Sequence, residues 1–319
     1  MQRRSEQHSL LCNWRCLLFA FAALLLTACA EPPSPQSGEL SQTGYMVQAQ
    51  FAPYYDQYGP TLLGEPISGL CEIAGGGQAQ YFQNMRLELT LDGQNVAVYP
   101  LGEWAYAGLR RKIVAPVPEK SRGRDFPETG FSVHDEFLDY YERNHGETIL
   151  GPPISPQLDE GALRVQYFRN GRLEWHPGAP VDQRVRPGML GQAHYLQEAH
   201  DATCEFRARP VDVTTVRNVQ VLASAEAPIL YTGEEQMIYA MVTTRAGVPV
   251  SGVPVTLTLR DTDWTLTVDL GRTDSHGRVQ GGLQMPRFVP GRMVGVSVDA
   301  QGLGGASIGQ TGLAFQTWW

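Results

Sequence analysis

Residues able to do acid–base chemistry are few and scattered along this chain of 319 residues. A strand would place Glu174 and His176 on one side, where a carboxylate and an imidazole could exchange a proton. No nucleophile or second carboxylate accompanies them, so we favour a hairpin end in which the imidazole stacks beneath Pro177. Sequence signatures of serine hydrolases, zinc proteases, P-loop proteins and Rossmann enzymes are missing, and the histidines show no metal-ligand spacing. We therefore expect no catalytic residue, no metal site and no cofactor.

Aromatic side chains are the better candidates for a binding site. Tyrosine and tryptophan combine an apolar ring face with a hydrogen-bonding group, and sugar rings stack on such faces. The expected glycan contacts are Tyr140, Tyr141, Tyr167, Trp175 and His176. The same aromatic residues recur at helix and strand spacings, and that periodicity is more typical of a buried core. Both interpretations stay open from the sequence.

The amino terminus predicts export. Three arginines precede an apolar run at 16–26 that is too short for a typical membrane-spanning helix. The run ends in Leu-Thr-Ala-Cys, which resembles the lipobox of bacterial lipoproteins. The resemblance implies a signal peptide at 1–28, a lipid on Cys29, and anchoring to the extracytoplasmic face of the cell membrane. An ordinary secretory signal followed by a coincidental cysteine is the alternative.

Two cysteines remain once the signal has been removed and Cys29 carries lipid. Cys71 and Cys204 would then face an oxidising compartment, where they could form a disulfide. Neither has a neighbouring cysteine or histidine pair at metal-binding spacing. Pairing requires their Cα atoms to lie within about 7 Å. The sequence leaves the pairing open.

Charge and composition exclude a nucleic-acid partner. The formal net charge is −8, and it becomes about −10 when three arginines and one glutamate leave with the signal. An acidic surface of mixed charge mainly keeps an exposed protein soluble. Residues 29–41 are rich in proline and serine and read as a solvated tether.

Two stretches of the chain repeat one pattern in register, which predicts a duplicated module. Each has a helical stripe around Phe-x-x-Tyr-Tyr, a Leu-Gly-x-Pro-Ile-Ser turn and an alternating Gln-Tyr-Phe…Arg-Leu-Glu hairpin. We expect one helix plus one hairpin per copy, and because so small a unit buries little, the copies should share a core or pack side by side. The expected boundaries are repeat 1 at 42–104, a linker at 105–127 and repeat 2 at 128–196.

This pattern resembles surface repeats of exported proteins from Chloroflexota-type bacteria. The specific matches are Glu128-Thr129-Gly130, Pro153-Ile154-Ser155, Val165-Gln166-Tyr167-Phe168 and Glu174-Trp175-His176-Pro177. The first copy lacks the terminal His-Pro and carries a glycine-rich insert. The resemblance implies a surface location and a fold rather than an activity.

After a second linker at 197–212, the region 213–319 changes character. Seven short runs rich in Val, Thr and Leu are separated by turn residues, which predicts an antiparallel β-sandwich. Its G-V-P-V-S-G-V-P-V run and its T-D-S-H-G turn resemble bacterial immunoglobulin-like domains. The predicted fold is therefore an α+β repeat module in two copies, followed by an all-β immunoglobulin-like sandwich.

Three classes of function remain at this point. The preferred one is a non-catalytic, lipid-anchored surface protein that binds cell-wall glycan or adheres to a surface protein. The second is a purely structural spacer or accessory subunit of a surface assembly. The third is a hydrolase whose site has no recognisable motif.

Overall fold

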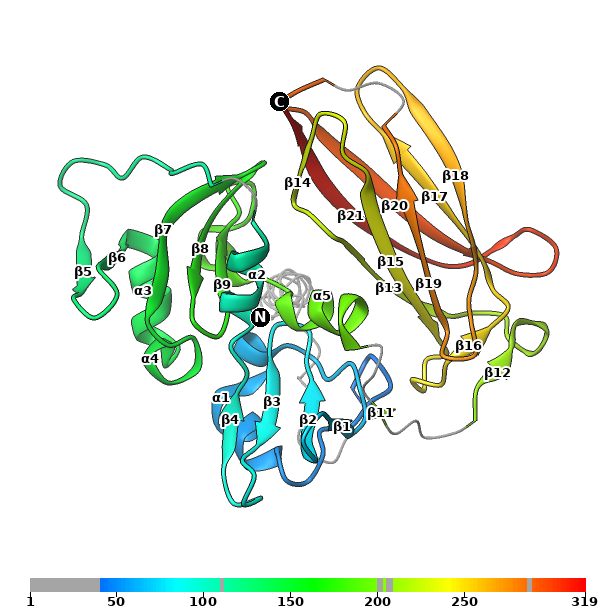
Figure 1. The fold of residues 1–319 in the computed structure, drawn as a ribbon, viewed down its shortest axis with the longest axis horizontal. Coiled ribbons are helices and arrows are strands. Elements are labelled where there is room, and N and C mark those ends of the chain that lie inside the picture. Colours follow the sequence, from blue (N-terminus) through cyan, green and yellow to red (C-terminus); the bar gives the residue numbers. More distant parts are fainter. Residues whose placement is uncertain (1–40, 110–111, 200–202, 205–208, 286–288) are drawn as a thin grey trace, which may run out of the picture. The chain divides into compact units, whose positions relative to one another are not determined.

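The computed structural model describes residues 41–319, except 110–111, 200–202, 205–208 and 286–288. All of them belong to one compact unit of the chain, Pro35–Trp319. The expected signal peptide, the expected lipid site Cys29 and nearly all of the expected tether lie outside the described residues. The described residues include three regions, segment 1 (42–104), segment 2 (128–196) and the C-terminal region (213–319), shown with their elements in Figure 1.

Segment 1 contains one interrupted helix, a meander of strands and a closing helix. Gly59 has φ 69° and is followed by Pro60, so the first helix kinks there. The strands form an antiparallel sheet in the order β11-β1-β2-β3-β4, in which β11 comes from a distant part of the chain. The elements are α1 (Ala52–Leu63), β1 (Cys71–Ile73), β2 (Gly77–Tyr81), β3 (Arg86–Leu89), β4 (Val96–Val98), α2 (Leu101–Gly108) and β11 (Thr203–Cys204).

Segment 2 is built in the same order. A small hairpin precedes the helices, a four-stranded antiparallel sheet follows in the order β10-β9-β8-β7, and a last helix closes the segment. The elements are β5 (Gly123–Phe126), β6 (Phe131–His134), α3 (Asp135–Arg143), α4 (Gly146–Ile149), β7 (Pro153–Glu160), β8 (Leu163–Phe168), β9 (Arg172–Trp175), η1 (Val181–Gln183), β10 (Val185–Pro187) and α5 (Leu190–Gln197).

Each segment contains more elements than the one helix and one hairpin that were expected. The expected hairpins are present as β2–β3 and β8–β9, but each sheet has further strands and each segment ends in a helix. The expected linker therefore begins inside α2 and ends inside the β5–β6 hairpin. The extra strands β1, β4 and β10 have three residues each, so two-residue alternation had too few positions to reveal them. The extra strand β7 has eight residues and begins in the Pro-Ile-Ser segment, which was expected to be a turn.

The Pro-Ile-Ser and Gln-Tyr-Phe motifs form one hydrogen-bonded unit in each segment. In segment 2 the Gln166 amide donates to the Ser155 carbonyl at 3.0 Å, and the Ser155 hydroxyl accepts from the Tyr167 amide at 2.9 Å. In segment 1 the Gln80 amide donates to the Ser68 carbonyl and the Tyr81 amide donates to the Ser68 hydroxyl, each at 2.9 Å. All four side chains are buried, so the shared motif satisfies buried polar backbone rather than binding a ligand.

The closing helix of each segment packs on the hairpin of the other segment. At Gly102 in α2, an added Cβ would lie 1.7 Å from the Phe168 carbonyl oxygen, and at Gly191 in α5 it would lie 2.1 Å from the Phe82 carbonyl oxygen. The next residue of each helix donates its amide across the same contact, from Glu103 to Arg169 and from Gln192 to Gln83. Only glycine permits so close an approach. Figure 1 shows α2 and α5 side by side between the two sheets.

The chain that follows each closing helix also crosses to the other segment. After α2, Val114 forms an antiparallel bridge with Leu158 of β7. After α5, Cys204 of β11 pairs with Cys71 of β1. Cys71 and Cys204 form a disulfide. Each segment therefore receives a helix from the other, together with strand β11 in segment 1 and the single Val114 bridge in segment 2, and one buried cluster contains side chains from both segments.

The C-terminal region is a β-sandwich, and all seven predicted strands are present. One sheet has the order β13-β15-β19, the other has the order β14-β21-β20-β17-β18, and a short parallel pair β12-β16 lies beside them. A core of valine, leucine and isoleucine fills the space between the sheets. The elements are β12 (Val211–Asp212), η3 (Val213–Thr215), β13 (Gln220–Ala225), β14 (Ile229–Tyr231), β15 (Gln236–Thr243), β16 (Val250–Ser251), β17 (Pro254–Arg260), β18 (Thr265–Arg272), β19 (Arg278–Leu283), β20 (Met293–Gln301) and β21 (Ser307–Trp318).

The T-D-S-H-G turn has the expected side-chain chemistry. A carboxylate oxygen of Asp274 accepts from the amides of His276 and Arg278 at 2.7 and 2.9 Å. Gly277 has φ 72° and an added Cβ there would lie 2.4 Å from the Val242 carbonyl oxygen. The motif thus makes a tight reversal and fits against a neighbouring strand.

Candidate functional site

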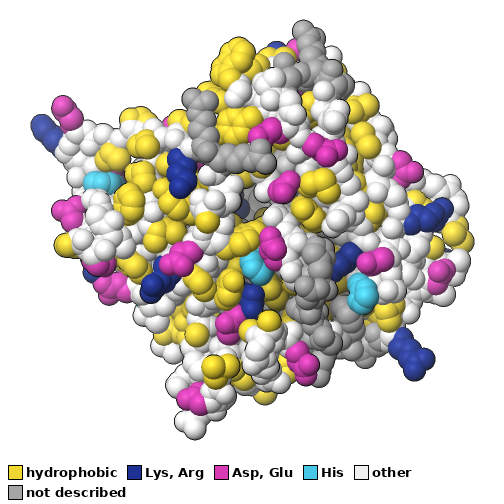
Figure 2. Space-filling view, in the orientation of Figure 1, with side chains coloured by type: hydrophobic (Ala, Val, Ile, Leu, Met, Phe, Trp, Pro, Cys, Tyr) yellow, Lys and Arg dark blue, Asp and Glu magenta, His cyan; other side chains and the backbone are white. Residues whose placement is uncertain are grey.

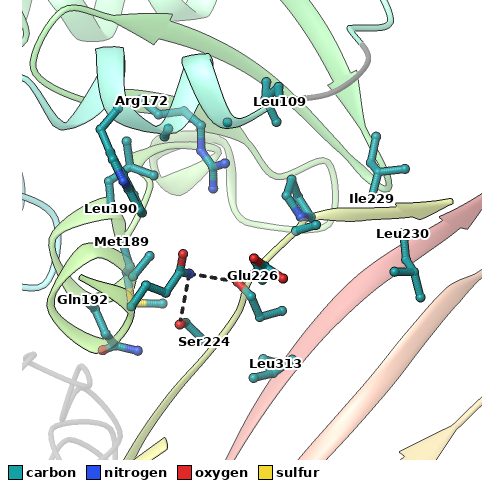
Figure 3. Close-up of a pocket in the computed structure, with 18 of the residues that line it drawn as sticks. Leu109, Arg172, Met189, Leu190, Gln192, Ser224, Glu226, Ile229, Leu230 and Leu313 are labelled. Atoms are coloured by element: carbon teal, nitrogen blue, oxygen red, sulfur yellow. Dashed lines mark hydrogen bonds between the residues drawn. The ribbon is translucent and has the colours of Figure 1, made fainter. Parts of the chain in front are cut away.

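A pocket of about 490 Å³ is the candidate site, and its size is ordinary for small-ligand sites in proteins. Its walls come from the two closing helices, from β8 and β9 of segment 2, and from β13, β14 and the turn before β15 (Figure 3). The lining residues include Trp104, Ala105, Tyr167, Arg172, Glu174, Gln192, Gln197, Glu198, Glu226, Tyr231, Glu234 and Glu235.

Two glutamines of α5 connect that helix to β13 at the pocket edge. The Gln192 side-chain amide donates to the Ala223 carbonyl at 3.0 Å. The Gln197 side-chain amide donates to the Ala225 carbonyl at 3.2 Å and reaches the Ser224 hydroxyl at 3.4 Å, as the dashed lines in Figure 3 show. These bonds satisfy backbone groups at the end of a strand and hold two walls of the pocket together.

A buried charged network forms one wall. The Arg172 guanidinium donates to Glu160 at 3.2 Å, to the Tyr167 hydroxyl at 3.1 Å and to Glu174. The Tyr167 hydroxyl in turn donates to Glu160 at 2.8 Å. The second Glu174 oxygen lies 3.1 Å from Nε2 of His176. One guanidinium thus serves two carboxylates, and Figure 3 shows Arg172 pointing into the pocket.

The pKa values of the two carboxyl groups in this network are shifted in opposite directions. Burial raises the pKa of Glu160 above its ordinary value, and the attraction of Arg172 offsets only part of that effect. Burial also acts to raise the pKa of Glu174, but Arg172 and the hydrogen bond from His176 outweigh it and lower the pKa to about 2. Glu174 is therefore a permanent anion at ordinary pH, paired with Arg172.

In segment 1 the space that corresponds to the pocket is filled by a side chain. The pattern of amide bonds after β4 matches that after β10, with Leu101 donating to Tyr99 and Leu190 to Gly188 at 2.8 Å each. In this register His194 of α5 corresponds to Ala105 of α2. His194 is buried, and its Nδ1 lies 3.1 Å from the Tyr81 hydroxyl. The small Ala105 leaves that space open beside segment 2.

The Arg86 guanidinium is correspondingly covered in segment 1. It lies 4.0 Å from the centre of the Tyr99 ring and donates to the Tyr81 hydroxyl at 3.2 Å. Gly188 stands at the position that corresponds to Tyr99, so Arg172 has no aromatic cover from that side. The pocket beside segment 2 is thus associated with two residue differences at corresponding positions. Ala105 stands where the other helix has His194, and Gly188 stands where segment 1 has Tyr99.

Three of the five expected glycan contacts are buried. Tyr140, Tyr141 and Tyr167 are buried, with relative exposures of 7%, 1% and 1%. Tyr141 stacks on Phe168 with ring centres 5.3 Å apart, and its hydroxyl donates to the Gly151 carbonyl. Their ring faces are covered by protein, so the core interpretation holds for them. Tyr167 lines the pocket only through its place in the charged network.

Trp175 and His176 are half-buried and lie away from the pocket lining. Trp175 packs against the shared core of the two segments. His176 is held by Glu174. The structure therefore does not bring the five expected glycan contacts into one binding face. The alternative acid–base pair, Glu174 and His176, forms a hydrogen bond, but Glu174 is already paired with Arg172.

Sequence reasoning missed the residues that open the pocket. Trp104 and Ala105 fell at the end of the expected first repeat and the start of the expected linker, and Glu226 followed a predicted strand without a motif. A usable signal was the match of Leu-Gly-Glu-Trp-Ala-Tyr to Leu-Gly-Gln-Ala-His-Tyr at 101–106 and 190–195. That match extends the repeated pattern by one helix and aligns Ala105 with His194.

A second pocket of about 510 Å³ is lined by Leu196 and by residues of β15, β18 and β19 and the turn between the last two strands. Within the described part of the chain, no cluster of acidic, histidine or cysteine side chains could hold a metal ion. None of the described helices is long and apolar enough to cross a membrane. Acidic and basic side chains are interspersed over the face shown in Figure 2.

Comparisons with known proteins add little. No family model and no curated protein matches the sequence. Among solved structures, the chain is similar to the extracellular domain of a protein described as a one-component system from B. thetaiotaomicron, at 7% identity and a TM-score of 0.19. That match covers 81% of this chain and 31% of the other. A likeness this weak carries no argument about fold or function.

Proposed function

We propose that this protein is a non-catalytic, lipid-anchored protein of the extracytoplasmic face that binds cell-envelope glycan in the pocket beside segment 2. The observation that carries the proposal is the pocket itself, which joins an aromatic wall at Trp104 to hydrogen-bonding groups at Arg172 and Glu226. An aromatic face with a few convergent polar groups is the usual arrangement for a ring-shaped, hydroxyl-rich ligand. The expected export signal and the expected lipid on Cys29 support the proposed location.

The charged network supports binding rather than catalysis. A general acid must hold a proton near the working pH, but the pKa of Glu174 is lowered to about 2 by Arg172 and His176 against the effect of burial. The pKa of Glu160 is raised by burial, yet its oxygens face Tyr167 and Arg172 rather than open space. Neither group is placed to protonate a glycosidic oxygen while the other attacks.

We further propose that segments 1 and 2 are copies of one module and that the C-terminal sandwich is immunoglobulin-like. The repeated Gln–Ser hydrogen bonds and the reciprocal contacts of Gly102 and Gly191 support the duplication. The sharp Asp274 turn between β18 and β19 supports the second statement. In this arrangement one copy has kept an open pocket, and the other copy is filled by His194.

A structural spacer or accessory subunit of a surface assembly is the second candidate. The observation that favours it is the exchange of helices between the segments, together with the crossings at β11 and Val114 and the Cys71–Cys204 disulfide. Such crossing connections make a rigid pair of modules, which suits a spacer as well as a binding site.

Sedimentation with insoluble envelope glycan separates the two candidates. Residues 30–319 without the lipid should sediment with the glycan, and Ala105→His should abolish sedimentation by filling the pocket as His194 fills segment 1. The matched control is Ala107→His on the same helix, at an exposed position that does not line the pocket. If wild type and Ala105→His stay in the supernatant equally, the spacer is favoured and glycan binding is wrong.

A further inference from the structure

The charges that line the pocket are unbalanced. They comprise five glutamates and one arginine. Arg172 is already engaged by Glu174 and by Glu160 behind it. The remaining four lining carboxylates are Glu198, Glu226, Glu234 and Glu235.

These four carboxylates come from separate parts of the fold. Glu198 follows α5, Glu226 follows β13, and Glu234 and Glu235 lie in the turn before β15. Glu198, Glu226 and Glu235 are exposed, and none of the three forms an ion pair with another residue that the structure describes. Carboxylates gathered around one hollow repel each other, and a cation placed there relieves the repulsion.

The comparison with segment 1 independently indicates a missing occupant in segment 2. There the neutral His194 ring fills the space and bonds Tyr81, beside one guanidinium and one carboxylate in the Arg86–Glu88 pair. In segment 2 the ring is gone, and the Tyr167 hydroxyl is bonded by an additional buried carboxylate, Glu160. Glu160 is covered by Tyr167 and Arg172, so the charged lining of the open space consists of the Arg172–Glu174 pair and the four other glutamates.

We propose that the pocket selects saccharides that carry a protonated amine, such as hexosamine units without an acetyl group. The amine would lie among Glu226, Glu198 and Glu235, with the ring against Trp104, whose face also attracts a cation. This inference rests on the proposed glycan binding and narrows it to one ligand class. The inference concerns only the charge of the ligand, so selectivity for an amine can be refuted while glycan binding in the pocket remains valid.

The contribution of the ligand's charge can be measured by comparing two oligosaccharides of equal length. Calorimetric titration of residues 30–319 should give about tenfold or greater preference for a fully deacetylated glucosamine oligomer over its fully N-acetylated counterpart, which keeps the rings and loses the cation. The preference should shrink at high salt, because exposed charges are screened. Ala105→His should abolish binding of both oligomers, whereas Ala107→His should leave both unchanged.

Charge-removing variants complete the test. Glu226→Gln and Glu235→Gln should each weaken only the amine-bearing oligomer by several-fold, while Glu119→Gln, at an exposed position outside the pocket, should have no effect. Equal affinity for both oligomers would overturn the charge inference and leave glycan binding intact. Binding of neither oligomer, with sedimentation on envelope glycan retained, would also overturn it. Amine binding that survives Ala105→His would show attraction to the acidic surface alone and would refute this site.

Discussion

Cys71 on β1 and Cys204 on β11 face each other in antiparallel register, and their disulfide ties segment 1 to the chain that leaves α5. The same register in segment 2 is held by Leu158 and Val114 without a covalent bond. The disulfide therefore fastens one of two equivalent crossings between the segments. It closes a loop with a sequence separation of 133 residues.

Removing this bond should lower the free energy of unfolding. By the chain-entropy estimate, a loop of this length contributes up to about 5 kcal/mol. Cys71→Ala with Cys204→Ala should therefore unfold at much lower denaturant concentration than wild type, and reduced wild type should resemble the double variant. Peptide mass spectrometry of unreduced protein should find the two cysteines linked. Two free thiols in the exported protein would contradict the pairing.

The two close glycine contacts should tolerate no side chain. Gly102→Ala and Gly191→Ala each place a Cβ against a carbonyl oxygen of the opposite hairpin, so each should cost about 1–3 kcal/mol or more in the free energy of unfolding. Gly108→Ala, on the same helix as Gly102 with open space around it, should be neutral or slightly stabilising. Chemical denaturation measures all three. Equal stability of the Gly102 and Gly108 variants would refute the close packing.

Residues 128–196 expressed alone should fail to fold. That fragment lacks α2, whose helix covers the β8–β9 hairpin, and it lacks Val114, which pairs with β7. Without them Tyr167 and Leu158 lose cover from Tyr106 and Ala105. We expect poor dispersion in its proton NMR spectrum, whereas residues 42–204 should give a dispersed one. A well-folded 128–196 fragment would show that the crossing contacts are dispensable.

The pH dependence of stability should carry a contribution from His194. Burial, and then the nearby Arg86, lower its pKa to about 4, whereas an unfolded histidine titrates near about 6.5. Between these values the unfolded state binds more protons, so this contribution is complete above about pH 6.5 and is lost as pH falls toward about 4, by on the order of 3 kcal/mol. His194→Gln should flatten the unfolding free energy over that window. Parallel curves for the two proteins would contradict the shift.

Regular alternation and turn chemistry made the sandwich predictable, since runs such as the one in β17 place every second residue in the core. The hairpins β2–β3 and β8–β9 and the helices that precede them were predictable for the same reason. The exchange between segments was not, because Gly102 and Gly191 carry no local signal that their partners are carbonyls in the other segment. The buried state of Tyr140 and Tyr141 was one of two open interpretations, and only packing decided it.

The candidate site was harder to predict than the fold. Trp104, Arg172 and Glu226 lie in three distant stretches, and no spacing rule relates them. Ala105 matters through the side chain that it lacks, which becomes visible only when His194 is seen filling the corresponding space. A sequence search for chemistry looks for reactive residues and passes over such a position.

The central claim is that the pocket beside segment 2 holds a sugar ring. The most direct measurement is a crystal structure of residues 30–319 grown with a deacetylated glucosamine oligomer. We expect electron density for one sugar ring between Trp104 and Glu226, with Arg172 at the wall beneath it. Density for the sugar at Trp175 and His176, with the pocket holding only solvent, would contradict it.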